Sequence, residues 1–260
     1  MRLQRSKSYR AEVITLRRSD LGEADRIITL FTREYGKRRA VARSVRRTKS
    51  RLAGHIELFT HADVYLAVGT NLDVLTQATA IEIFPTIASD LGRFARASWA
   101  TEVVDRLTPV GEPDPALFGL LLQTIRLLAS EDDSQSIHLR QFELHALKML
   151  GYRPHLESCV NCGRDLEEAT NQFSPSLGGV MCRTCDSEEV TLRISPSALK
   201  VMRWLETQEI GAAGRLNTND SLDAELENLH RACLSQVLGG ALRSASLLDR
   251  TRTRSTPQPV

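Results

Sequence analysis

The first 84 residues contain short runs in which apolar and polar side chains alternate, a pattern typical of β-strands. Val64, Leu66 and Val68 alternate in this way, and the Gly69-Thr70-Asn71 turn after them predicts a hairpin. In all, the pattern predicts strands at residues 11–16, 25–32, 37–43, 63–68 and 72–76. Five short strands with a longer break after the third favour a Greek-key barrel of the OB type. An SH3-like barrel would give nearly the same pattern.

Beyond Pro85 the apolar period changes to that of an α-helix. Apolar residues recur every four positions from Leu91 to Leu107, and residues 117–128 are apolar on nearly all sides, as expected of a buried helix. Further helices are predicted at 139–150, from the capping pair Ser195-Pro196, and at 226–237. The polar segment 250–260, with two prolines, predicts a disordered tail.

Four cysteines form two close pairs in the stretch that interrupts these helices, Cys159 with Cys162 and Cys182 with Cys185. Each C-x2-C turn supplies two thiolates from one tight knuckle, so the four together predict a tetrahedral Zn²⁺ site. Gly163 would let the backbone fold over the first knuckle. With four thiolate ligands no position is left for water, so we expect one structural zinc ion and no hydrolytic centre.

Other interpretations of the cysteines have less support. Two disulfides would require an oxidising compartment, and a redox C-x-x-C usually occurs once, near a βαβ pattern. Cys233 lies in an apolar helical stripe and is expected to be a buried free thiol. His155 could replace a cysteine ligand, but four thiolates already suffice.

Taken together, these patterns predict an α+β multidomain chain. It would comprise an N-terminal five-stranded OB-type β-barrel and a C-terminal all-helical domain with an inserted four-cysteine zinc ribbon. The expected domains are an OB-fold domain at 1–84, a first helical part at 85–155, a zinc-binding segment at 156–187, a second helical part at 188–249 and the tail at 250–260.

The net charge of +2 conceals an asymmetry between the two ends of the chain. Residues 1–53 carry 16 Lys/Arg and 5 Asp/Glu, whereas residues 54–260 carry 18 Lys/Arg and 27 Asp/Glu. The amino-terminal end should therefore attract a polyanion.

Half of these 16 cations lie in one segment of fifteen residues, 37–51. Its eight cations are the expected DNA-binding residues: Lys37, Arg38, Arg39, Arg43, Arg46, Arg47, Lys49 and Arg51. Arginine, with a planar fork that suits phosphate oxygens, outnumbers lysine among them. Strand alternation would place Lys37, Arg39 and Arg43 on one face, and the run from Ser44 would form a loop able to wrap a nucleic-acid strand.

Aromatic residues make up only 5% of the chain, so few rings are available as stacking platforms for bases. Affinity should come from phosphate neutralisation and be independent of sequence. If about five to eight phosphates are contacted, the log–log salt slope on duplex DNA should be roughly −4 to −7.

Several kinds of chemistry lack their sequence motifs. There is no P-loop, no G-x-S-x-G and no H-E-x-x-H, so neither a nucleotide site nor an enzyme is expected. The six histidines are scattered, and His138 and His145 are expected at the surface. No apolar run is long enough for a membrane span and no signal peptide is recognisable, so a cytoplasmic location is expected.

Two sequence boxes stand in a fixed order along the chain. The first is GEADRIITLFTREYG at 22–36, followed by ARSVRRTKSR at 42–51. The second is Phe142-Glu143-Leu144, then Gly151-Tyr152-Arg153-Pro154, leading into CVNCG at 159–163. Together they resemble the bacterial RecO recombination-mediator family, and the resemblance extends to about Leu248. Two departures are Ser44, where the family commonly has glycine, and His145-Ala146 in place of a more uniformly leucine-rich stretch.

The resemblance implies an OB barrel and a helical domain with a zinc ribbon. It also implies binding of single- and double-stranded DNA, annealing of complementary strands, and loading of RecA onto strands coated by single-stranded DNA-binding protein. The implied partners are RecR, RecA and the acidic tail of the coating protein, in a cytoplasmic, nucleoid-associated setting. Some family members lack the cysteines, so the zinc would support the fold. An RNA-binding or transcription-associated barrel with a zinc ribbon and a metal-dependent hydrolase are the alternatives.

Overall fold

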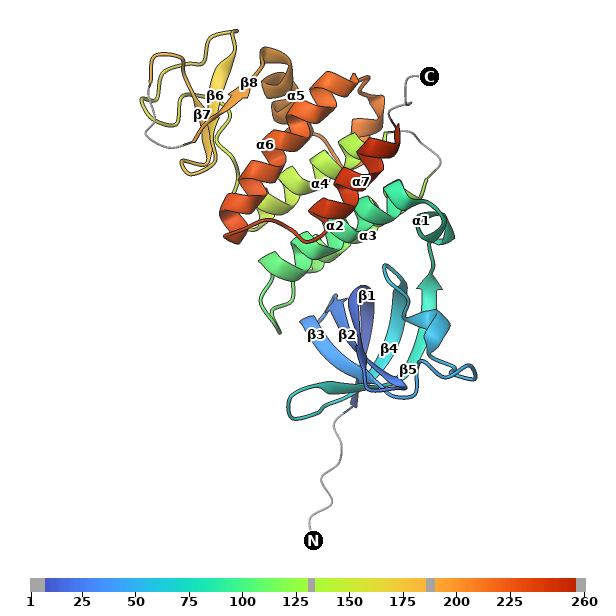
Figure 1. Ribbon diagram of the computed structural model, residues 1–260. Coiled ribbons are helices and arrows are strands. Elements are labelled where there is room, and N and C mark those ends of the chain that lie inside the picture. The colour runs from blue at the N-terminus through green and yellow to red at the C-terminus, as the bar shows by residue number, and fades with distance from the viewer. Residues whose placement is uncertain (1–7, 131–133, 186–189, 256–260) are drawn as a thin grey trace, which may run out of the picture. The chain divides into compact units, whose positions relative to one another are not determined.

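The computed structural model describes residues 8–130, 134–185 and 190–255 (Figure 1). The chain divides into two compact units, Met1–Ala129 and Ser130–Val260. Among the described residues, the first unit contains the β-barrel and three helices, and the second contains four further helices and a small sheet. None of the helices in the described part of the chain has the length and apolar character that crossing a membrane would require.

The barrel is closed by five strands in the order β1-β2-β3-β5-β4. Their bounds are β1 Ser8–Leu21, β2 Asp25–Thr32, β3 Gly36–Ala42, β4 His61–Ala67 and β5 Asp73–Glu82, with a 3₁₀ turn η1 at Ala53–His55. β3 and β5 pair in parallel, and β1 pairs with both β2 and β4. A simple meander would pair β3 with β4, so this order confirms the predicted OB-type barrel.

The barrel interior is filled by the apolar residues of the alternating pattern. Ile28, Leu30, Val64 and Leu66 are fully buried, with Ala40 and Ala42 facing them from β3. Strand β1 is longer than the predicted 11–16, because its polar end pairs with β2 as an exposed hairpin. Hydropathy does not reveal such an extension, since neither face of it is buried.

Three helices complete the first unit: α1 Pro85–Ser89, α2 Leu91–Leu107 and α3 Pro115–Ala129. Asp90 caps α2 by accepting a hydrogen bond from the Arg93 amide at 2.7 Å. Gly36 (φ +66°) begins β3 beside the loop that joins α2 to α3, where an added Cβ would lie 2.0 Å from the carbonyl oxygen of Glu112. Only glycine fits there, so the barrel and this loop are held in close contact.

The second unit is built on α4 Gln135–Met149, α5 Pro196–Thr207, α6 Asp220–Leu238 and α7 Ala245–Ser255, with a 3₁₀ turn η2 at Ala212–Arg215. The predicted helix start is confirmed, since Ser195 Oγ accepts a hydrogen bond from the Ala198 amide at 3.1 Å. Helix α4 contacts both α5 and α6. His138, expected at the surface, is therefore buried, and His145 lies 3.0 Å from the Leu205 carbonyl oxygen.

The end of the chain differs from the prediction. Helix α7 continues to Ser255, so the predicted disordered tail does not begin at residue 250. Its remaining part, 256–260, lies outside the described residues. Residues 250–255 are polar, but they continue a helix that begins at Ala245 and includes the more apolar Leu247-Leu248 pair.

The cysteine segment forms a three-stranded antiparallel sheet in the order β7-β6-β8. The strands are β6 Asn171–Ser174, β7 Gly179–Met181 and β8 Leu192–Ile194. They are too short to show a period of two in the sequence. We refer to residues 156–194 as the ribbon.

Candidate functional site

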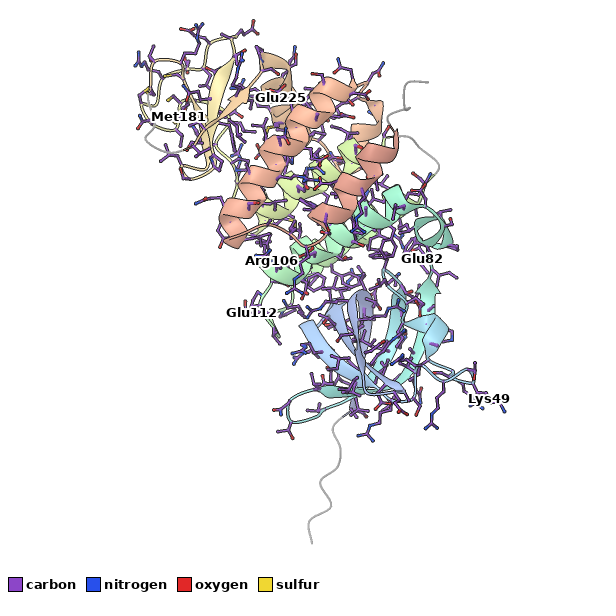
Figure 2. The ribbon with its side chains drawn as sticks, in the orientation of Figure 1. Lys49, Glu82, Arg106, Glu112, Met181 and Glu225 are labelled. Carbon is purple, nitrogen blue, oxygen red and sulfur yellow. The ribbon has the colours of Figure 1, made fainter. Side chains whose placement is uncertain are left out.

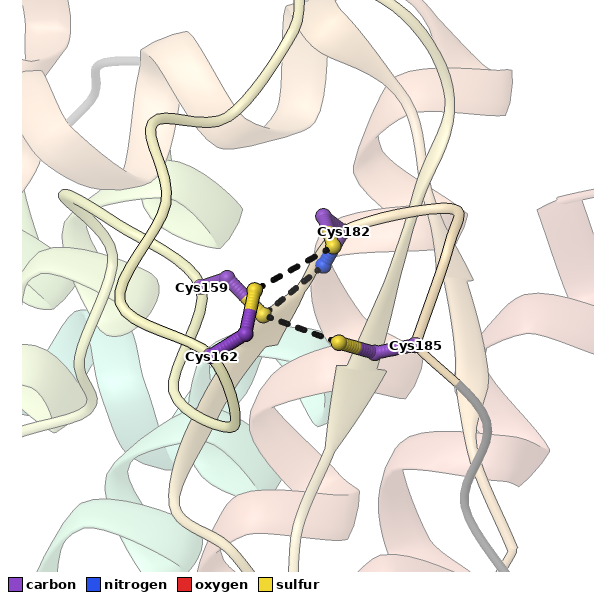
Figure 3. A group of neighbouring side chains, drawn as sticks. All are labelled: Cys159, Cys162, Cys182 and Cys185. Atoms are coloured by element: carbon purple, nitrogen blue, oxygen red, sulfur yellow. Dashed lines mark hydrogen bonds between the residues drawn. The ribbon is translucent and has the colours of Figure 1, made fainter.

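The four cysteines of the ribbon converge, as Figure 3 shows. Their four Sγ atoms all lie within 4.8 Å of one another and could hold a metal ion. The two knuckles face each other, with Sγ–Sγ distances of 3.8 Å from Cys159 to Cys185 and 3.7 Å from Cys162 to Cys182. Cys162 is exposed and the other three are buried.

The backbone of each knuckle is fixed by local hydrogen bonds. Gly163 (φ +73°) donates its amide to the Cys159 carbonyl at 2.8 Å, and Cys159 donates to the Arg164 carbonyl at 2.8 Å. In the second knuckle the Cys185 amide donates to the Cys182 carbonyl at 3.2 Å. The left-handed conformation explains why glycine follows the second cysteine.

Three polar groups donate hydrogen bonds toward the sulfur atoms. The Cys182 amide lies 3.3 Å from Cys159 Sγ, and the Thr184 hydroxyl lies 3.2 Å from Cys182 Sγ. Arg164 Nε donates to Cys162 Sγ at 3.4 Å, and its Nη2 donates to the Thr184 hydroxyl at 3.2 Å. Arg164 therefore joins the two knuckles. Sequence reasoning missed this residue, although its place directly after Gly163 was a signal.

These contacts favour the thiolate form of the cysteines, but the sulfur atoms also form hydrogen bonds with one another. The hydrogen bond from Thr184 lowers the pKa of Cys182 to about 6, whereas hydrogen bonds with Cys162 and Cys182 raise the pKa of Cys185 to about 12. Four thiolates this close would repel one another, and a divalent cation removes that repulsion. The donor set is all sulfur, which suits a soft or borderline metal and leaves no place in a tetrahedron for water.

The other candidate ligands lie elsewhere in the unit. His155 Nε2 is 2.8 Å from the Ser158 hydroxyl and is not part of the cluster. Cys233 is a buried free thiol on α6, as predicted, and burial raises its pKa to about 12.

The eight cations of the basic segment do not share one environment. Lys37 is only 9% exposed: its Nζ lies 3.3 Å from Asp105 Oδ1 and donates to the Asp105 backbone carbonyl. Asp105 lies on α2, so Lys37 links the barrel to that helix. Its charge is neutralised within the protein.

Arg38 is partly buried, and Arg46 is paired with groups of the barrel. Arg38 lies on the same face of β3 as Ala40 and Ala42, which face the barrel interior, and its Nε is buried. Arg46 Nη1 lies 3.1 Å from the Gly22 carbonyl oxygen and 3.5 Å from Asp20 Oδ2. Arg46 therefore ties the segment to the β1–β2 turn.

The remaining five cations face solvent. They are exposed, and among the described residues none has a carboxylate within ion-pair distance: Arg39, Arg43, Arg47, Lys49 and Arg51. We call these five residues the basic face. Arg39 projects outward from β3, and the other four lie in the loop between β3 and β4, with Lys49 extended from the barrel in Figure 2.

The start of this loop is anchored although its cations are exposed. Val45 is 2% exposed in the barrel core, and the Arg46 amide donates to the Ala24 carbonyl at 3.0 Å. Ser44 has φ +54°, and its amide donates to Asp25 Oδ1 at 2.7 Å. The turn therefore adopts the left-handed conformation that glycine prefers, with serine in its place.

Comparisons with known proteins cover nearly the whole chain. Residues 6–84 match the family described as Recombination protein O N terminal, and residues 88–246 match Recombination protein O C terminal. A protein named DNA repair protein RecO from Roseiflexus sp. (strain RS-1) is 43% identical over 249 residues, which is 95% of this chain and 87% of the relative. Relatives of the same name from Dehalococcoides mccartyi (strain ATCC BAA-2266 / KCTC 15142 / 195) and Symbiobacterium thermophilum are 36% and 37% identical, covering 93% and 94% of this chain and 95% and 98% of theirs.

Proposed function

The chain belongs to the RecO family of DNA repair proteins, and from that premise we propose that it is a non-enzymatic recombination mediator that binds single- and double-stranded DNA. The observation that carries the proposal is the basic face. Five exposed cations without carboxylate partners in the described chain lie on one strand and one loop of an OB-type barrel. Phosphate oxygens are the ligands that such arginines and lysines bind best.

Annealing of complementary strands follows from the same charges. Two single strands repel each other through their phosphates, and a cationic face lowers that repulsion while the bases pair. No base needs to be read, so the activity would be independent of sequence. No proton transfer or bond cleavage is involved, which accords with a chain whose sequence lacks hydrolase and nucleotide-binding motifs.

Mediation requires protein partners in addition to DNA. We propose RecR, RecA and the acidic tail of single-stranded DNA-binding protein as partners in loading RecA onto coated strands, in the cytoplasm and at the nucleoid. The support for these partners is the family membership.

The cysteine cluster would hold one structural Zn²⁺ through Cys159, Cys162, Cys182 and Cys185. The support is the all-sulfur donor set and its closeness. The ion would stabilise the ribbon, whose strands are only three or four residues long and in which Met181 packs in one buried cluster with three of the cysteines. No step of DNA binding is assigned to it.

The proposal is tested by a strand-annealing assay and a binding titration across a salt series, with and without the coating protein. We expect a log–log slope of roughly −4 to −7 on duplex DNA and annealing that fades as salt rises. A flat salt response would contradict the proposal. RNA and DNA of equal length, in competition, test the alternative of an RNA-binding or transcription-associated barrel, which requires a clear preference for RNA.

A further inference from the structure

A pocket of about 530 Å³ lies on the ribbon, and none of the four cysteines is among its lining residues. Its lining includes Arg183, Arg193, Gln172, Thr170 and Thr191. Among the described residues, no carboxylate side chain lines this pocket, and nothing in the proposed function uses it.

The sheet register explains why these side chains gather. Gln172 on β6 lies opposite Arg193 on β8 and opposite Met181 on β7. Arg183 lies two residues past Met181, in the turn of the second knuckle, and lines the same pocket. The pocket therefore takes one donor-bearing side chain from each of three neighbouring segments: Gln172, Arg193 and Arg183.

A hydrogen bond within the pocket orients the Gln172 amide as a donor. The Thr191 hydroxyl donates to Gln172 Oε1 at 2.9 Å, which fixes the amide and leaves its Nε2 hydrogens for a ligand. Arg183 and Arg193 are exposed, and neither has an ion-pair partner within the part of the chain that the structure describes. Two guanidinium forks and one amide N–H₂ form a set of donors suited to an oxyanion.

We propose that this pocket binds the terminal phosphate of a DNA strand. Donors from three segments can each take one oxygen of a tetrahedral phosphate, whereas a planar carboxylate offers only two oxygens. A terminal monoester carries close to two negative charges at neutral pH, matching two arginines. The inference rests on the proposed DNA binding for its choice of ligand.

The surroundings of the pocket favour a strand end over the middle of a strand. The loop that leads into β6 carries three exposed carboxylates, Asp165, Glu167 and Glu168. These carboxylates, which lie on the same ribbon as the pocket, would repel a polyanion lying across it, so like charge disfavours a continuous strand there. A single phosphate that reaches the donors from one end avoids most of that repulsion.

The test compares fluorescein-labelled 12-mers with a 5′-phosphate, a 3′-phosphate or hydroxyls at both ends, by anisotropy with zinc-loaded full-length protein. We expect one phosphorylated form to bind about tenfold more tightly than the hydroxyl form, since the additional contacts are charge-assisted. Arg183→Gln/Arg193→Gln should remove that preference and leave binding of the hydroxyl form unchanged. Lys200→Gln, which removes an exposed charge from α5, should keep the preference.

Equal binding of all three oligonucleotides by the wild type, or a preference that survives Arg183→Gln/Arg193→Gln, would overturn the proposal. Arg39→Gln/Arg47→Gln separates it from the proposed function, because that variant should weaken all three oligonucleotides by one common factor. A titration of the wild type with thymidine 5′-monophosphate, followed by NMR at the Gln172 side-chain amide, needs neither the basic face nor a variant. The amide resonances should shift when thymidine 5′-monophosphate is added and should not shift with thymidine. A dissociation constant of about 10 mM is roughly the weakest expected for one phosphate, so the absence of a shift at that concentration would also reject the site.

Discussion

Arg164 Nε donates a hydrogen bond to Cys162 Sγ at 3.4 Å, so the one exposed thiol of the cluster is the one that contacts a guanidinium. The same guanidinium reaches the second knuckle through Thr184. A zinc ion with four thiolates carries a net charge of −2, and Arg164 would offset half of it. The side chain thus stabilises the ligand that solvent reaches most easily.

We therefore expect Arg164→Gln to weaken zinc binding by about 10- to 100-fold, the usual effect of removing a partner of a metal ligand. Competition with a chromophoric chelator measures the affinity, and the rate of Cys162 alkylation reports its exposure. Arg164→Lys keeps the charge without the fork and should give an intermediate value. Arg193→Gln is the matched control, and an equal loss there would contradict a specific role of Arg164.

The basic face predicts a defined change in salt dependence. Arg39→Gln/Arg47→Gln removes two exposed cations and should reduce the log–log salt slope on duplex DNA by about 2, because each phosphate contact contributes about 0.9. Arg10→Gln/Arg33→Gln removes two cations that are ion-paired with Asp63 and Glu12 on the same barrel. That control should leave the slope unchanged, and parallel slopes in all three proteins would reject the assignment of the face.

Because Lys37 is paired with Asp105, we expect its replacement to lower the stability of the protein without weakening DNA binding. Lys37→Met removes the nearer partner of Asp105, whose other ion-pair partner in the described part of the chain is Arg17, at 3.6 Å. Unfolding in urea should show the free energy of unfolding lowered by about 2 kcal/mol, as for a broken, partly buried ion pair. Binding below the unfolding transition should match the wild type. Weaker binding with unchanged stability would instead place Lys37 among the DNA contacts.

Lys37 and Arg39 illustrate which features of the fold and the site could be predicted from the sequence. The barrel, the helix starting at Ser195 and the four cysteines were predictable because each depends on local periodicity or spacing. The different environments of Lys37 and Arg39 could not be predicted, because Lys37 is paired with Asp105, which is distant in the sequence and is brought close by the fold. The ion pair of Arg46 with Asp20 and the hydrogen bond from Arg164 to Thr184 could not be predicted for the same reason.

The turn at Ser44 predicts a stabilising substitution. Ser44→Gly should raise the free energy of unfolding by about 0.5–1 kcal/mol, because φ +54° strains any residue with a Cβ. The hydrogen bond from the backbone amide of residue 44 to Asp25 Oδ1 would be kept. Ser19→Gly, at an exposed position of β1, should lower it by about 0.5–1 kcal/mol through added chain entropy. Thermal or urea unfolding checks both values, and the same sign in both variants would contradict the strain at Ser44.

A buried pair in the second unit predicts a pH dependence of stability. His230 Nδ1 lies 2.8 Å from Glu143 Oε2, and burial lowers the pKa of His230 despite the favourable contact with that carboxylate. In the unfolded chain the imidazole titrates near its ordinary value of about 6.5, so below that pH the unfolded state binds a proton that the folded state does not. Stability should fall as the pH drops from about 7 to about 5.5, with a slope of up to about 1.4 kcal/mol per unit from this residue.

His230→Gln should be less stable than the wild type at about pH 7.5 and should have a shallower pH slope, because it removes the group that titrates differently on folding. His155→Gln, at an exposed site, should keep the wild-type slope. Urea unfolding at intervals of about half a pH unit measures the difference between the variants. Parallel pH profiles for wild type and His230→Gln would show that the imidazole binds protons equally in the folded and unfolded states.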